Sequence, residues 1–128
     1  MGLPQAINSM LNVAIGAQVG NRILPVYAPL NTDRPFCVYT TNGLRPTETK
    51  DSPNAVDIRT IGIAIYHETH SSLYTLMESV RDELVYKHET IEGVVIDSCI
   101  LVEESVDYDS EEKLYIGIQV FDFRIWPT

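Results

Sequence analysis

The stretch TIGIAIYHETHSSLYTLMESVRDEL, residues 60–84, changes from a strand pattern to a helix pattern part-way along. Isoleucines at 61, 63 and 65 alternate with small residues, so they share one face of a strand that we place at 56–68. The apolar residues that follow recur at helical spacing and predict a helix over 71–86; they are Leu73, Leu76, Met77, Val80 and Leu84. We expect this stripe to pack on the isoleucine row, because each element has one apolar face to bury.

The junction between the two elements, YHETH (66–70), raises the question of a metal site. Zinc-protease helices place two histidines four residues apart, on one helical face. Here His67 and His70 are three apart and straddle the junction, so we interpret the motif as a polar turn. Ser71 or Ser72 is expected to cap the following helix. We therefore predict that the protein has no catalytic residue, metal ion or cofactor. The competing enzyme hypothesis is a metal-dependent hydrolase that uses His67, Glu68 and His70.

The remaining elements complete an α+β pattern. An N-terminal helix is expected over 5–18, and it should end near Gly16. A short proline-limited extended segment and a strand at 34–41 follow. Two long strands, 93–104 and 113–126, are joined as a β-hairpin. We predict one domain spanning 1–128, with a mixed, mainly antiparallel sheet of four to five strands and two helices packed on one face.

Two polar segments interrupt this pattern. Residues 42–55, NGLRPTETKDSPNA, hold no large apolar residue after Leu44 and predict a long flexible loop. Residues 103–112 are rich in carboxylates and predict an acidic hairpin tip. Within that tip Tyr108 stands between Asp107 and Asp109, and an exposed aromatic residue among carboxylates is typical of a contact surface.

The composition narrows the class of protein further. A net charge of −9 and a pI of about 4.6 disfavour a surface built to hold phosphates. Cys37 and Cys99 each lie in an apolar strand, which predicts buried reduced thiols. No run approaches the roughly 20 apolar residues that span a bilayer, and the start of the chain lacks the signal-peptide pattern. We therefore expect a cytosolic protein, or one assembled in a cytosol.

The order of elements and several short patterns resemble the tail-completion or tail-terminator proteins of long-tailed bacteriophages. The first pattern is GNRILPVYAPLNTDRPFCVY (20–39), where the matching residues are Arg22, Ile23, Pro25, Pro29, Pro35, Phe36 and Val38. The second is the helix after TIGIAIYHET, matched by Leu76, Val80, Arg81 and Leu84. The third is the acidic turn SVDYDSEEKLY (105–115) before VFDFRIW, although no glycine follows its aspartates.

This resemblance implies a structural virion protein. The family's subunits close into a ring, commonly a hexamer, at the head-proximal end of the tail tube. The ring ends tube polymerisation and joins the tail to the head. Implied partners are other copies of the chain, the major tail tube protein and a head–tail connector or stopper, with DNA passing through the lumen unbound. The implied location is the tail or neck of the virion, assembled in the host cytoplasm.

The same resemblance gives the 42–55 loop a role in assembly. We expect it to become ordered against a neighbouring subunit or the tube, with contacts from its charged residues Arg45, Glu48, Lys50 and Asp51. Two other hypotheses stay open besides the enzyme. One is a stopper or other neck component, and the other is a cellular adaptor that binds proteins through a sheet edge.

Overall fold

The computed structural model describes residues 3–26, 28, 32–46, 57–85 and 87–126. Within these residues two helices are present, α1 (Leu3–Ile15) and α2 (His70–Leu84). The six strands are β1 (Ile23–Pro25), β2 (Phe36–Pro46), β3 (Asp57–His67), β4 (Glu89–Ile91), β5 (Val94–Asp109) and β6 (Leu114–Ile125). Neither helix is long and apolar enough to cross a membrane.

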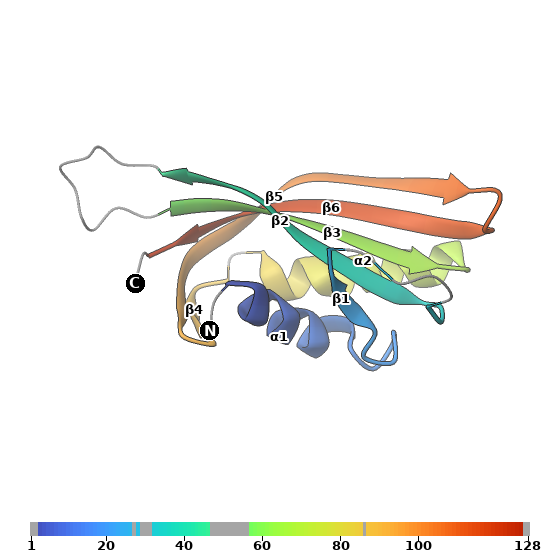
Figure 1. The fold of residues 1–128 in the computed structure, drawn as a ribbon, viewed down its shortest axis with the longest axis horizontal. Helices are drawn as coiled ribbons and strands as arrows, with labels where there is room; N and C mark the ends of the chain where they lie inside the picture. The colour runs from blue at the N-terminus through green and yellow to red at the C-terminus, as the bar shows by residue number, and fades with distance from the viewer. Residues whose placement is uncertain (1–2, 27, 29–31, 47–56, 86, 127–128) are drawn as a thin grey trace.

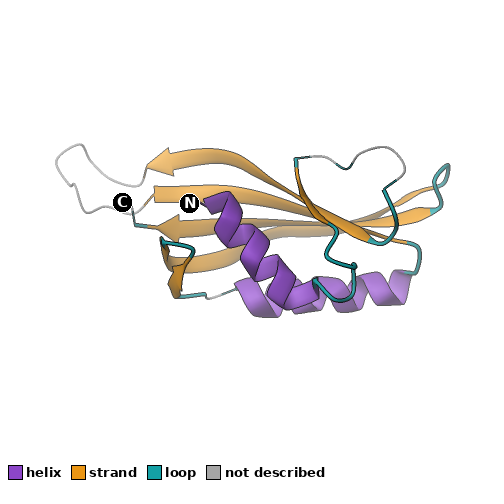
Figure 2. Cartoon of the chain, turned by 60° about the horizontal axis from the view of Figure 1, so that its bottom comes forward, coloured by secondary structure: helices purple, strands orange, loops and turns teal. Residues whose placement is uncertain are grey.

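The strands form one mixed sheet in the order β1-β2-β3-β6-β5-β4. β1 runs parallel to β2, and the other neighbours are antiparallel. Both helices lie on the same face of the sheet (Figures 1 and 2). The predicted α+β class with two helices on one face is therefore confirmed, with six strands in place of four to five.

The additional strand is β4, a three-residue edge strand that pairs with Val94, Val95 and Ile96. Its residues are mostly polar, so no apolar alternation marks it in the sequence. The tight turn after it has two successive residues at positive φ, Glu92 at 50° and Gly93 at 80°. Turns of this kind match the twist of antiparallel strands, so the pair Glu-Gly was the available signal.

The predicted contact between α2 and the isoleucine row is confirmed. All five stripe residues of α2 are buried, as are Ile61, Ile63 and Ile65. α2 also lies close to β6 at Gly117, where an added Cβ atom would come within 2.5 Å of the Met77 sulfur. The absence of a side chain at this position thus sets how closely the helix approaches the sheet.

Two predicted boundaries are wrong. β2 continues through Pro46, so the loop predicted at 42–55 does not begin at 42. Backbone pairing with β3 resumes after a register shift between Thr41 and Gly43, and it extends the strand without any apolar pattern. β5 likewise continues to Asp109, so most of the predicted acidic tip, 103–112, is strand. Residues 47–56 lie outside the described residues.

The expected helix cap is also wrong. Ser71 and Ser72 lie inside α2, and the N-cap residue is Thr69, whose side chain makes no capping hydrogen bond. Instead the backbone N–H of Thr69 donates to Nδ1 of His67 at 3.0 Å. The histidine side chain therefore stabilises the turn before the helix, and it does not cap the first helical N–H groups.

Both cysteines are buried and free, as predicted. Burial raises the pKa of the Cys37 thiol to about 12. Burial also raises the pKa of the Cys99 thiol, and the negative charge of Asp122 adds to the effect. Because the thiolate is the reactive form of cysteine, neither side chain is poised for nucleophilic chemistry at neutral pH.

We expect Leu76→Ala to lower the free energy of unfolding by about 2–5 kcal/mol, since it leaves a cavity in the layer between helix and sheet. Chemical denaturation followed by circular dichroism would measure the loss. Glu78→Ala, at an exposed position on the same helix, is the matched control and should change stability by about 0.5 kcal/mol or less. Equal effects of the two substitutions would contradict the packing described here.

Candidate assembly site at the β5–β6 hairpin

The turn between β5 and β6 is built by its own polar side chains. Oδ1 of Asp109 accepts hydrogen bonds from the backbone N–H groups of Glu111 (3.0 Å) and Glu112 (3.2 Å). Lys113 adopts a positive φ of 57°, which closes the turn although no glycine is present. Asp109, predicted as a contact residue, thus holds the turn together.

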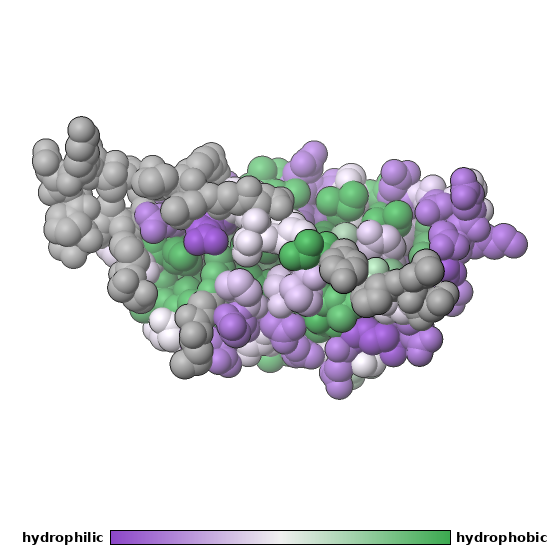
Figure 3. Space-filling model, in the orientation of Figure 1, coloured by the Kyte–Doolittle hydropathy of each residue, from purple (hydrophilic) through white to green (hydrophobic). Residues whose placement is uncertain are grey.

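Arg34 attaches this turn to two other segments. Its Nη1 donates to the carbonyl oxygen of Glu112 at 2.9 Å. Its guanidinium also forms ion pairs with the carboxylates of Glu112 (3.5 Å) and Glu68 (3.8 Å). Each exposed ion pair is worth little alone. Together they join the segment before β2, the β3–α2 turn and the hairpin at one end of the molecule, where hydrophilic side chains gather (Figure 3).

Four rings form an aromatic cluster beside the hairpin: His70, Tyr74, Tyr108 and Tyr115. The ring of Tyr108 lies 4.7 Å from that of Tyr115, between ring centroids. The His70 ring lies 5.2 Å from both Tyr115 and Tyr74. Tyr108 is nevertheless 48% exposed. Tyrosines that are positioned by their neighbours yet reach solvent are typical of protein interfaces.

The hairpin presents different chemistry on its two faces. Tyr108 pairs in register with Tyr115, whereas Asp107 pairs with Ile116. Successive residues of a strand point to opposite faces, so the Asp107 carboxylate lies on the face away from the helices and the Tyr108 ring lies on the helix side. The three predicted contact residues are therefore split: one turn residue, one aromatic residue and one acidic residue on the other face.

A partly buried polar network connects the hairpin to α2, and the sequence analysis missed it. Gln119 is fully buried, and its Nε2 donates to the Met77 carbonyl (3.0 Å) and to Oε1 of Glu104 (2.9 Å). Arg81 Nη1 donates to both oxygens of Glu104, at 2.9 and 2.8 Å. The available signal was a glutamine at an inward position of an apolar strand. This network fixes the helix against the middle of the hairpin.

The histidine motif is divided among these structures. His67 accepts the Thr69 hydrogen bond, Glu68 pairs with Arg34, and His70 belongs to the aromatic cluster. Within the described part of the chain, no three histidine, cysteine, aspartate or glutamate side chains are grouped to hold a metal ion. The turn interpretation of the motif fits these contacts.

The predicted assembly loop is described only at its start. Arg45 lies on β2, where its backbone pairs with Ile58. Glu48, Lys50 and Asp51 lie outside the described residues.

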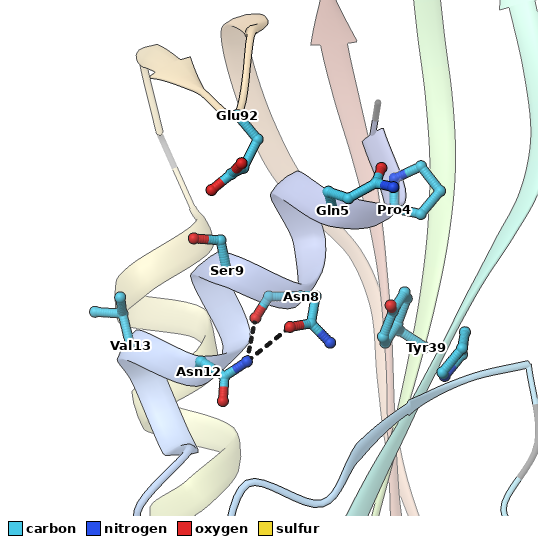
Figure 4. Close-up of a pocket in the computed structure, with 9 residues that line it drawn as sticks. Pro4, Gln5, Asn8, Ser9, Asn12, Val13, Tyr39 and Glu92 are labelled. Carbon is cyan, nitrogen blue, oxygen red and sulfur yellow. Dashed lines mark hydrogen bonds between the residues drawn. The ribbon is translucent and has the colours of Figure 1, made fainter. Parts of the chain in front are cut away.

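A separate open groove of about 700 Å³ lies beside α1. Figure 4 shows its lining residues along α1, with Tyr39 on one side of the helix and Glu92 on the other. The helix contributes amide and hydroxyl groups, and Asn12 donates to Oδ1 of Asn8 at 2.8 Å.

The sequence pattern of the tail completion protein gp17 family matches residues 9–126. The chain belongs to this family. Its fold is similar to that of a chain in a structure described as the virion of a native gene transfer agent particle, with a TM-score of 0.75 and 13% identity. The match covers 98% of this tail completion protein and 95% of the other chain. No curated protein sequence matches it.

Family membership places this tail completion protein among the structural proteins of the phage tail, and so in the virion. Family membership supports the resemblance to phage tail-completion proteins over the hypotheses of a cellular adaptor or a hydrolase. The aromatic cluster beside the hairpin is accordingly a candidate for contact with other virion proteins.

We expect acid to weaken the β3–α2 turn through His67. Partial burial lowers the pKa of His67 below its ordinary value of 6.5, and Glu68 offsets part of this effect. Folding therefore favours the neutral imidazole. The neutral His67 side chain therefore contributes its full stabilisation above pH 6.5, its ordinary pKa in the unfolded chain. This stabilisation is lost as the pH falls through the lower pKa that His67 has in the folded protein. Protonation of Nδ1 would also remove the hydrogen bond from Thr69.

NMR titration would check this expectation, with the midpoint of His67 below pH 6.5. Glu68→Gln is the matched variant and should lower the midpoint further, because it removes a charge that stabilises the imidazolium. A midpoint at or above 6.5 would refute the assignment.

Proposed function

We propose that this protein forms a ring at the head-proximal end of the phage tail tube, where it terminates tube polymerisation and joins the tail to the head. The observation that carries the proposal is the match of the tail completion family to residues 9–126. We expect six subunits in the ring, because the tail-terminator proteins that the sequence resembles commonly form hexamers. The ring's partners are then other copies of the chain, the major tail tube protein and a head–tail connector or stopper.

The surface chemistry supports a role in assembly. A net charge of −9 suits a joint through which DNA slides, because an acidic wall repels the phosphate backbone. The exposed aromatic cluster offers the kind of anchor that dominates binding energy in protein interfaces. In this proposal Tyr108 and Asp107 contact a neighbouring virion protein, and Asp109 holds the turn that presents them.

Removing the gene from the phage would test the proposed function. We expect free heads, unattached tails and tubes longer than normal in electron micrographs, because nothing then stops the growth of the tube. A plasmid copy of the wild-type gene should restore joined particles. Tails of normal length attached to heads without the protein would refute the proposal.

We expect Tyr108→Ala to impair incorporation into particles while the subunit stays folded, since the side chain is half-exposed. A hot-spot loss of about 2 kcal/mol corresponds to roughly thirty-fold weaker binding. Tyr108→Phe keeps the ring contact with Tyr115 and should retain most of the function. Thermal melting would establish folding, and particle counts would measure incorporation. Wild-type yields from Tyr108→Ala would remove this residue from the interface.

A further inference from the structure

Charge is distributed unevenly along this chain. Residues 1–46 hold three arginines and one aspartate, a net charge of +2, and residues 1–21 hold no charged side chain. Residues 93–128 hold eight carboxylates and two basic residues, a net charge of −6. The strand order turns this into a difference across the molecule, because β1 and β2 lie at one side of the sheet and β5 and β4 at the other.

The first side has a surface groove whose described lining residues include no carboxylate. We call it the neutral edge, and it comprises Val26 after β1 with Val38 and Thr40 of β2, which line this groove together. Val26 is 68% exposed and has a φ of 70°, although β-branched residues rarely adopt the left-handed conformation. Its N–H donates to the Tyr39 carbonyl at 2.8 Å, which holds it there. Backbone strain of this kind is found mainly at functional surfaces.

The second side has an open strand edge. β4 pairs with β5 only at 94–96, and no other described strand lies beyond β5. We call the exposed residues of β5 beyond that pairing the acidic edge. Its apolar members are Ile100, Val102, Val106 and Tyr108, and its exposed carboxylates include Glu103 and Asp107. Open edges bearing apolar side chains are sites of protein association.

We propose that the acidic edge of each copy docks against the neutral edge of the next copy. The inference rests on the proposed ring. Copies of a chain with a charge of −9 repel one another, and like charges placed together across an interface weaken binding. A contact between two acidic edges would place Glu103 and Asp107 beside the same residues of a second copy. A contact between the acidic and neutral edges avoids this and brings exposed apolar residues of both edges together.

The same pairing determines the symmetry of the assembly. An interface between two different surfaces is heterologous and produces a closed ring or an open filament, whereas a self-complementary surface produces a dimer. Each copy uses both of its edges, so every subunit in the ring has the same surroundings. The acidic edge is then covered at each joint instead of being left free.

Substitution pairs that differ only in charge would test the inference. Val26→Asp and Val102→Asp each place a carboxylate in one edge, and Val26→Asn and Val102→Asn are the neutral controls. Both valines are more than half exposed, so folding should be retained and is checked by melting. We expect each aspartate variant to lose self-association at least tenfold relative to its asparagine control in analytical ultracentrifugation.

A mixture of the two aspartate variants gives the decisive measurement. Each variant keeps the edge that the other has lost, so an equimolar mixture should form a dimer and nothing larger. A mixture that stays monomeric while the wild type assembles would overturn the inference. Wild-type association by either aspartate variant alone would overturn it too.

A photocrosslink tests the same contact inside particles, even if the isolated protein does not associate. Val26→p-benzoylphenylalanine should join to residues 98–109 of another copy, and the same substitution at Glu78, on the outer side of α2, should not. A crosslink from position 26 to a different virion protein, or none at all, would overturn the inference while the proposed function stands. If the wild-type protein is absent from particles, the proposed function is refuted, and the inference about the two edges is refuted with it.

Discussion

The apolar stripe of α2 packs against the isoleucine row of β3, and Gly117 allows the helix to approach β6 closely. This contact determines how the rest of the chain is arranged. Two helices of this length cover only one face of a six-stranded sheet, so the other face and both edges are left for other uses. The outer strands β1 and β4 are three residues each, and β4 covers the outer edge of β5 only at residues 94–96.

The parts of the fold that were predicted correctly are those in which apolar periodicity and burial coincide. The stripe of α2, the isoleucines of β3 and the buried cysteines all follow from spacing alone. The errors lie where backbone hydrogen bonds decide the structure without an apolar pattern. β2 runs on through Asn42–Pro46, and β5 runs on to Asp109, because each has an antiparallel partner strand that no local sequence feature reveals.

In the candidate site, too, the sequence did not reveal which residues contact one another in the folded chain. Composition indicated that the hairpin was acidic and carried a tyrosine, and it placed three neighbouring residues in one contact patch. Strand geometry separates them, and the turn uses the Asp109 carboxylate for its own backbone. The ring of Tyr108, on the other hand, contacts Tyr115 of β6, and Tyr115 contacts His70 of α2, so this cluster forms only in the folded chain. The hydrogen bond between Gln119 and Glu104 likewise joins residues that are distant in sequence.

The burial of both cysteine thiols affects how the protein responds to oxidation outside the host cell. A virion is assembled in a reducing cytosol and is then released by lysis into an oxidising medium, where exposed cysteines form disulfides or are oxidised further. Cys37 and Cys99 are buried, and their raised pKa values keep them protonated at neutral pH. Neither thiol of this tail completion protein is therefore poised to form a disulfide when the particle passes from the host cytosol to the outside medium.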